Sequence, residues 1–238
     1  MHVGNGRGDS QAGAGGGTPV AFADRAHAGR FLAGKLRAYE NRGDVLVLAL
    51  PRGGVPVGYE VARGLNVPLD VFLVRKLGVP WHPELAMGAI ATGGVRVLNP
   101  SVVRELGITD ADIDAVAARE QRELERREAM YRGSGPAPQV AGRIIILIDD
   151  GLATGSTMRA AVEAIRLQHP AKVVVAVPVA SADVCEAISR EADEVVCARA
   201  PKPFIAVGLW YEDFTATTDQ EVQTLLERAT SRAEHRAA

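Results

Sequence analysis

Five short segments along the chain are almost entirely apolar. They span residues 44–50, 69–74, 144–148, 172–178 and 194–198. Because their apolar residues do not alternate with polar ones, each segment predicts a strand buried on both faces, as in a parallel sheet. Apolar residues at helical spacing fill the stretches between them. The pattern predicts an α/β fold with a doubly wound, mainly parallel five-stranded sheet.

One stretch departs from this order. Residues 89–98 place a Gly-Gly pair between two short apolar runs, which predicts a β-hairpin. Residues 100–132 follow as mostly helix, with a charged face over 119–128. That face is most simply solvated, and contact with a partner subunit is the alternative.

The third predicted strand ends in two acids and a loop rich in glycine and hydroxyl groups. Asp149 and Asp150 follow the strand, and Ala153-Thr154-Gly155-Ser156-Thr157 leads into a helix. The start of a helix attracts anions through unpaired N–H groups and the helix dipole. The acids would repel a phosphate there, but they suit the hydroxyls of an attached sugar, or Mg²⁺. The predicted ligand is a phosphorylated sugar.

Two other predicted strands end in residues that suit anions. Arg52, Gly53 and Gly54 follow the first strand, and Arg75 and Lys76 follow the second. The carboxyl ends of strands in an open α/β sheet face a common ligand crevice, so we expect these residues near the phosphate loop. An ordinary strand-to-helix turn and solvated charges are the plainer alternatives.

The central strand, its two acids, three further residues and Thr154-Gly155-Ser156-Thr157 resemble a known motif. It is the phosphoribosyl-diphosphate (PRPP) motif of type I phosphoribosyltransferases, matched over Ile144 to Thr157. The resemblance implies that fold, and the Mg²⁺-dependent transfer of ribose 5-phosphate from PRPP to a nucleobase or amine, with release of pyrophosphate.

The resemblance also implies roles for the residues named above. Ala153 to Thr157 would bind the 5-phosphate, and Asp149 and Asp150 would act in catalysis by holding ribose hydroxyls or Mg²⁺. Lys76 would also be catalytic. The residues implied to bind pyrophosphate are Arg52, Gly53, Gly54, Arg75 and Lys76.

Ala153 departs from the family pattern, because most catalytic members carry an aspartate at that position. The departure keeps two alternatives open, a non-catalytic PRPP or nucleotide sensor and a nucleotide hydrolase. A DNA-binding regulator of this kind would usually carry a basic helix-turn-helix domain, and the sequence contains none.

The segment 199–216 is predicted to form a small C-terminal hood over the site. It is rich in aromatic residues and loosely resembles the base-stacking hood of purine members of the family. Trp210, Tyr211 or Phe214 could stack on the acceptor, and Asp213 could accept hydrogen bonds from its ring N–H groups. The alternative is that the aromatic side chains only pack the core of the hood.

Composition limits the partners and the cellular location that we expect. A net charge of −2 over 238 residues argues against a nucleic-acid partner. No apolar run suits a membrane span or a signal peptide, so we expect a cytoplasmic protein without a membrane partner. In that location, Cys185 and Cys197 are expected to be buried thiols rather than a disulfide. Residues 1–20 are glycine-rich and predicted to be disordered, residues 21–238 form the predicted domain, and a homodimer is one possible assembly.

Overall fold

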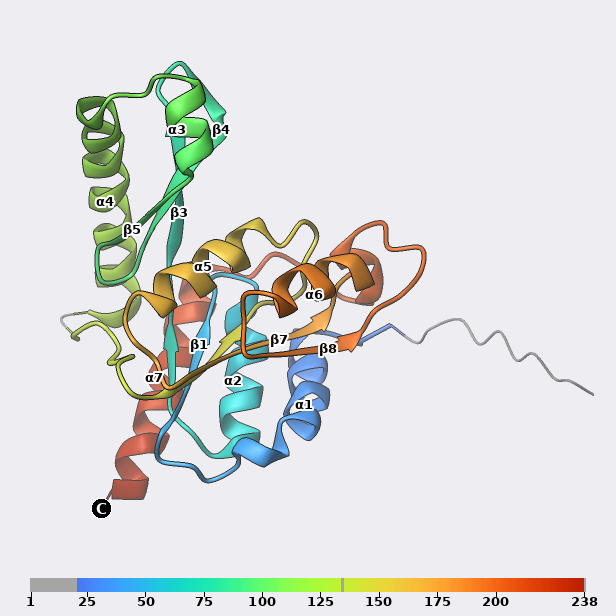
Figure 1. Ribbon diagram of the computed structural model, residues 1–238. Coiled ribbons are helices and arrows are strands. Elements are labelled where there is room, and N and C mark those ends of the chain that lie inside the picture. The colour runs from blue at the N-terminus through green and yellow to red at the C-terminus, as the bar shows by residue number, and fades with distance from the viewer. Residues whose placement is uncertain (1–20, 134, 238) are drawn as a thin grey trace, which may run out of the picture.

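The five apolar segments form one parallel sheet in the computed structural model, which describes residues 21–133 and 135–237 (Figure 1). The strand order is β2-β1-β6-β7-β8, and every neighbouring pair is parallel. The strands are β1 (Val45–Ala49), β2 (Leu69–Val71), β6 (Ile144–Ile148), β7 (Lys172–Val179) and β8 (Glu194–Arg199). All residues of β1 and β6 are buried, as their unbroken apolar runs predict. The predicted five-stranded parallel sheet is confirmed.

Helices cover both faces of this sheet. Side chains of α1 (Arg25–Lys35) and α2 (Gly54–Leu65) pack on one face, and those of α5 (Ser156–Arg166) and α6 (Ala182–Ser189) pack on the other. Alternate residues of each strand point to the two faces, so that Ile145 belongs to one core and Ile146 to the other. The sheet is therefore doubly wound, and its carboxyl edge is left for loops.

A second sheet stands beside the first and forms an arm. It contains three antiparallel strands in the order β3-β4-β5, namely β3 (Val74–Val79), β4 (His82–Ala91) and β5 (Val95–Leu98). The helices α3 (Pro100–Glu105) and α4 (Asp110–Arg132) accompany it, and Figure 1 shows the arm extending away from the parallel sheet. The helix α7 (Asp219–Ala237) packs against α4 at the base of the arm. The predicted hairpin over 89–98 is confirmed by the pairing of β4 with β5.

The second predicted strand was too long. The sequence pattern predicts one strand over 69–74, whereas β2 ends at Val71 and Val74 begins β3. The backbone N–H of Phe72 still bonds to Ala49 of the parallel sheet, but that of Leu73 bonds to the hydroxyl of Thr92 in the arm. The side chains of Phe72 and Leu73 are both buried, so a single apolar run contributes residues to both sheets.

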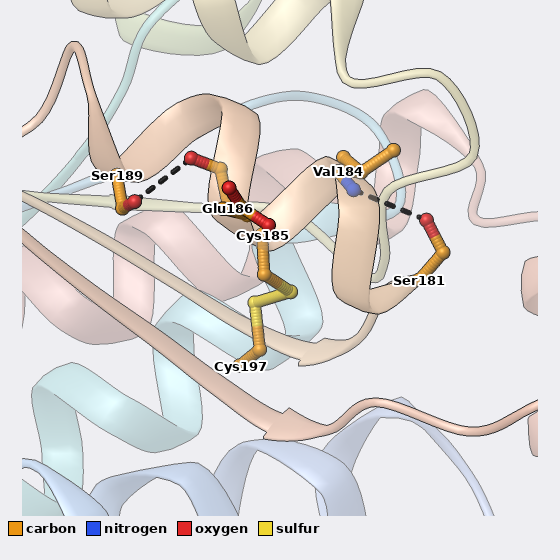
Figure 2. The surroundings of a disulfide bond; sticks show 6 residues. All are labelled: Ser181, Val184, Cys185, Glu186, Ser189 and Cys197. Atoms are coloured by element: carbon orange, nitrogen blue, oxygen red, sulfur yellow. Dashed lines mark hydrogen bonds between the residues drawn. A yellow bond between two sulfur atoms is a disulfide. The ribbon is translucent and has the colours of Figure 1, made fainter.

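A disulfide joins Cys185 of α6 to Cys197 of β8, with the two sulfur atoms 2.11 Å apart (Figure 2). The prediction of two thiols was therefore wrong. The two cysteines lie on neighbouring elements of the same layer, where α6 covers the edge strand of the sheet, and nothing in the apolar pattern signals that they meet.

Two further predictions concern membrane spans and the N-terminal residues. No helix among the described residues is long and apolar enough to cross a membrane. The predicted disorder of residues 1–20 lies outside the part of the chain that the structure describes.

Candidate functional site

The predicted phosphate loop lies between the end of β6 and the start of α5. Gly155 is the N-cap of α5 and has a φ of 74°, in the left-handed region that favours glycine. A Cβ added there would lie 2.9 Å from Cγ1 of Val184, so α6 also requires a glycine at this position. The hydroxyls of Thr154 and Ser156 are 3.1 Å apart. The loop thus presents hydroxyl groups and the first N–H groups of a helix together, which is an arrangement that binds anions.

The two acids lie at the root of this loop and are half-buried. The backbone N–H of Asp150 donates to Oδ1 of Asp149 over 2.9 Å. Burial raises the pKa of Asp149 well above its ordinary value, and the charge of Asp150 raises it further. Burial also raises the pKa of Asp150, although a guanidinium partner opposes that shift. A pair of carboxylates that is costly to ionise alone is suited to a cationic ligand.

The glycine loop after β1 presses directly against this acid pair. A Cβ added at Gly53 would lie 2.0 Å from Oδ2 of Asp150, and one at Gly54 would lie 2.7 Å from the backbone oxygen of Ile148. Only glycine permits this approach. The structure therefore brings together the acids and the glycine pair, two predicted groups that are about a hundred positions apart in the sequence. Arg52 is exposed beside them, and its peptide bond with Pro51 is cis.

The two cations after the second strand point in different directions. Arg75 pairs with Glu120 of α4, with Nη2 and Oε2 2.6 Å apart. Lys76, the next residue of β3, lines a cavity of about 700 Å³ together with Ser156 and Thr157 of α5. Side chains alternate along a strand, so only one of these neighbours can face the phosphate loop. Lys76 therefore shares that cavity with the first turn of α5, while its Nζ donates to the backbone oxygen of Glu84 in the arm over 3.2 Å, and Arg75 turns toward α4.

The hood is built by both ends of the described chain. The backbone N–H of Phe22 donates to the oxygen of Trp210, and the N–H groups of Glu212 and Asp213 donate back to Phe22 and Ala23. Phe22 and Tyr211 are buried in one cluster, against which Trp210 packs. The O–H of Tyr211 donates to the backbone oxygen of Asp150 over 2.6 Å, which fixes the hood to the acid pair.

The predicted acceptor residues lie in this hood, but not all of them face the acids. Asp213 is exposed, and its carboxylate accepts from the backbone N–H and the hydroxyl of Thr215, at 2.9 Å and 2.6 Å. Phe214 packs against Tyr211, with ring centroids 5.0 Å apart. The aromatic rings therefore do pack the hood, as the alternative interpretation predicts, while Phe214 keeps one partly exposed side.

Arg25 is a site residue that the sequence analysis missed. Its Nε donates to Oδ2 of Asp150 over 2.8 Å, and its Nη1 donates to the backbone oxygen of Thr215 over 2.7 Å. Its guanidinium carbon lies 4.0 Å from the centre of the Phe214 ring. The first residue of α1 thus joins the acid pair to the hood, across 125 and 190 positions of sequence. No local motif marks it, because its partners are so distant.

The donor set at the acids suits Mg²⁺. Asp149 and Asp150 offer carboxylate oxygens on one side of the crevice, and no group of three or more acidic, His or Cys side chains forms a metal site in the described parts of the chain. Proteins commonly bind Mg²⁺ through one or two carboxylates, with substrate phosphates and water completing the shell. These two residues would hold the ion jointly with a phosphorylated ligand.

Comparison with known proteins agrees with this geometry. A family model described as "Phosphoribosyl transferase domain" matches residues 82–209. Two proteins of Mycobacterium tuberculosis, from strains CDC 1551 and H37Rv, are each 49% identical over 208 residues, which is 87% of this chain and 47% of theirs. Both carry the name "Putative phosphoribosyl transferase". The chain spans about half the length of these curated relatives.

A solved structure is also similar to this chain, over almost the whole length of the solved protein. The protein TT1426 from Thermus thermophilus is 43% identical, with a TM-score of 0.78, over 88% of this chain and 99% of that one. The chain therefore belongs to the phosphoribosyl transferase domain family.

Proposed function

We propose that the protein transfers ribose 5-phosphate from PRPP to a nitrogenous acceptor, a nucleobase or an amine, and releases pyrophosphate. The observation that carries this proposal is the packing of Gly53 against the Asp150 carboxylate, one loop away from the helix start at Gly155. In this proposal, the two loops that meet at the acid pair are both anion-binding loops. PRPP has the matching order of groups: a phosphate, a sugar with two hydroxyls, and a pyrophosphate.

Each group has a proposed task in the reaction. Breaking the bond between C1 and the pyrophosphate oxygen develops positive charge on the ribose and negative charge on the leaving group. Loop residues 153–157 hold the 5-phosphate, so the sugar is fixed at one end. Arg52, Gly53, Gly54 and Lys76 receive the leaving group, and Asp149 and Asp150 orient the ribose hydroxyls and stabilise the cationic sugar. Arg75 remains a weaker candidate, because Glu120 holds it.

Mg²⁺ is the proposed cofactor. Bound between the acid pair and the ligand, it would supply positive charge that neutralises the pyrophosphate. The protein's own contribution is the position of the two carboxylates, which the backbone of Asp150 and the hood both fix. We further propose a place in nucleotide metabolism, a cytoplasmic location and a homodimeric assembly.

A non-catalytic PRPP or nucleotide sensor is the second candidate, and Ala153 favours it. The loop amides can hold a phosphate without an acid at that position, whereas a catalytic base for the acceptor would be missing. Hydrolysis of a nucleotide, with water as the acceptor, is the third and weaker candidate.

Calorimetric titration with PRPP and Mg²⁺, followed by a pyrophosphate-release screen over purines, pyrimidines and small amines, tests the proposal. Binding with release for one acceptor supports a transferase and identifies its substrate. Tight binding without release for any acceptor supports the sensor. Absence of binding would overturn the proposal, since the loops would then serve some other phosphorylated ligand.

A loop variant tests the 5-phosphate site separately. Ser156→Pro removes one backbone N–H at the start of α5 while remaining compatible with a helix start. It should weaken binding of ribose 5-phosphate and of PRPP alike. If only PRPP binding weakens, the 5-phosphate does not lie in this loop.

A further inference from the structure

We infer that Arg25 is a specificity-determining residue of the acceptor site, and that the acceptor is a flat nitrogen heterocycle carrying an acidic group. The inference rests on the proposed transferase function and adds the chemical class of the acceptor. It comes from three features of the site: the position of the guanidinium, the engagement of the nearby acid Asp213, and the alanine in the phosphate loop.

The guanidinium of Arg25 occupies the place between the acid pair and the hood. Its side chain is 11% exposed, held by Asp150 on one side and by the oxygen of Thr215 on the other. It also lies 4.0 Å from the centre of the Phe214 ring, at stacking distance. An acceptor that reaches C1 of a ribose held by Asp150, and that stacks on the hood, must therefore contact Arg25 or displace it.

Asp213 is the hood acid predicted to accept a ring N–H, and one of its carboxylate oxygens, Oδ1, already accepts both donors of Thr215. Ala153 provides no acid in the phosphate loop. A neutral purine or amine needs a group that takes up its proton during transfer. The acceptor side of this site offers a cation and aromatic rings instead.

An acidic heterocycle fits these features. Arginine presents its N–H groups as a rigid fork that matches a carboxylate, and the two bonds in the structure use only two of its five donors. When ribose hydroxyls or Mg²⁺ share the charge of Asp150, Thr215 and Phe214 still hold the guanidinium in place. The acceptor's nitrogen lone pair forms the bond to C1 while the C1–O electron pair leaves with pyrophosphate. The ring nitrogen of a pyridine carries no proton, so transfer to it needs no group that accepts one.

Matched pairs of heterocycles test the inference. Nicotinate with nicotinamide, and isonicotinate with isonicotinamide, compare an acid with a neutral partner of similar shape. Each is titrated calorimetrically into protein saturated with Mg²⁺ and PRPP, and pyrophosphate release is followed in parallel. We expect at least one acid to bind about tenfold more tightly than its neutral partner, as one charge-assisted fork would give.

Three variants connect this preference to one side chain. Arg25→Gln should reduce the acid-to-neutral ratio to near one, and Arg25→Lys should keep part of it, because lysine retains the charge without the fork. Arg30→Gln is the matched control, since Arg30 lies on the same helix, is exposed and faces Glu60 at 3.8 Å. Its ratio should equal that of the unmodified protein.

Several outcomes would overturn the inference. These are equal or tighter binding of the neutral partners, an acid preference that survives in Arg25→Gln, and no binding of any heterocycle by PRPP-loaded protein. Should Arg25→Gln not fold, the ratio in the unmodified protein and in Arg25→Lys still decides. PRPP affinity is measured first: its absence would overturn the proposed function itself, whereas PRPP binding without an acid preference overturns only the role of Arg25.

Discussion

The phosphate end and the hood end of the candidate site are built in different ways. The phosphate end is one continuous segment, residues 149–157, which follows a fully buried strand and enters a helix at Ser156. The hood end joins the start of the described chain to its last third, through Phe22 with Trp210 and Arg25 with Thr215. Local chain geometry therefore forms the first, and long-range contacts assemble the second.

This difference predicts different mechanical properties. The loop is held by its neighbours in sequence and by the sheet, so it should keep its shape whenever the core is folded. The hood depends on a few hydrogen bonds and one small aromatic cluster, and regions with few buried contacts open at lower free energy. We expect ribose 5-phosphate binding to be insensitive to the hood, and acceptor binding to depend on it. Four predictions follow this contrast, from the largest effect to the smallest.

Asp150 belongs to both ends, so its substitution should have the largest effect. Asp150→Asn removes the charge that holds ribose hydroxyls or Mg²⁺ and also the ion pair with Arg25. Affinity for Mg-PRPP, measured by calorimetry, should fall about 100-fold, or ~2.7 kcal/mol. Asp114→Asn serves as the control, because that acid is exposed in the arm and pairs with Arg96. Unchanged affinity in Asp150→Asn would contradict the assignment of the two carboxylates to the ribose hydroxyls or Mg²⁺.

The disulfide should stabilise the phosphate end more than the hood. It closes a loop over a separation of 12 residues, and α6 packs Val184 and Ile188 against Gly155. Reduction with dithiothreitol should lower the free energy of unfolding by ~2 kcal/mol in denaturant titrations. A double variant with Cys185→Ser and Cys197→Ser should be equally weakened and indifferent to the reductant. Equal stability of the oxidised and reduced protein would contradict this prediction.

The pH dependence of binding should distinguish the contribution of the acid pair from that of the phosphate loop. Burial raises the pKa of Asp149 and of Asp150 above the ordinary value of about 4, so the ionised pair forms only at higher pH. Affinity for Mg-PRPP should increase as the pH rises from about 4 through the raised pKa values of the two acids. The increase is at most about tenfold per pH unit for each proton that ligand binding releases. Ribose 5-phosphate without Mg²⁺ controls for ionisation of the phosphate itself. A parallel pH profile for both ligands would remove the acids from the binding reaction.

The same shifts have an opposite consequence for the stability of the unliganded protein. The folded state binds more protons than the unfolded state when its carboxyl pKa values are raised. The stabilisation is complete below the unfolded value of about 4, and it is lost as the pH rises through the folded values. Ligand binding and fold stability should therefore change in opposite directions over this window.

Tyr211→Phe should have the smallest effect and should be confined to the hood. Burial raises the pKa of the Tyr211 phenol, which therefore stays protonated and donates to the backbone oxygen of Asp150. Loss of this bond should cost about 1 kcal/mol of unfolding free energy. It should weaken acceptor binding while ribose 5-phosphate affinity stays constant. Tyr59→Phe, on α2, is the control, and equal losses for both ligands would argue against separate ends.

The elements that the sequence predicted correctly are those whose signal is local. The unbroken apolar runs of β1 and β6, the loop from Asp149 to Thr157, and the Gly-Gly hairpin can each be recognised within a short window of sequence. The fold class and the family follow from these segments, because buried parallel strands and helix-start anion loops have physical requirements that few residue types meet.

The remaining features depend on contacts that no short window contains. Arg25 reaches Asp150 from a helix that begins 125 positions earlier, and Cys185 meets Cys197 only because α6 covers β8. The early end of β2 depends on a hydrogen bond to Thr92 from another sheet. Likewise, the opposite directions of Arg75 and Lys76 follow from the exact start of β3, which the apolar run 69–74 conceals.

The two tryptophans of the chain lie in its two most different outer parts. Trp81 is 59% exposed in the turn between β3 and β4 of the arm, and Trp210 packs against the aromatic cluster of the hood. Indole emission shifts with the polarity around the ring, so the native fluorescence spectrum contains one signal from each part. Trp81→Phe would leave Trp210 as the sole emitter. Occupation of the space beneath the hood could then be followed optically, on the millisecond timescale, in a protein that carries no label.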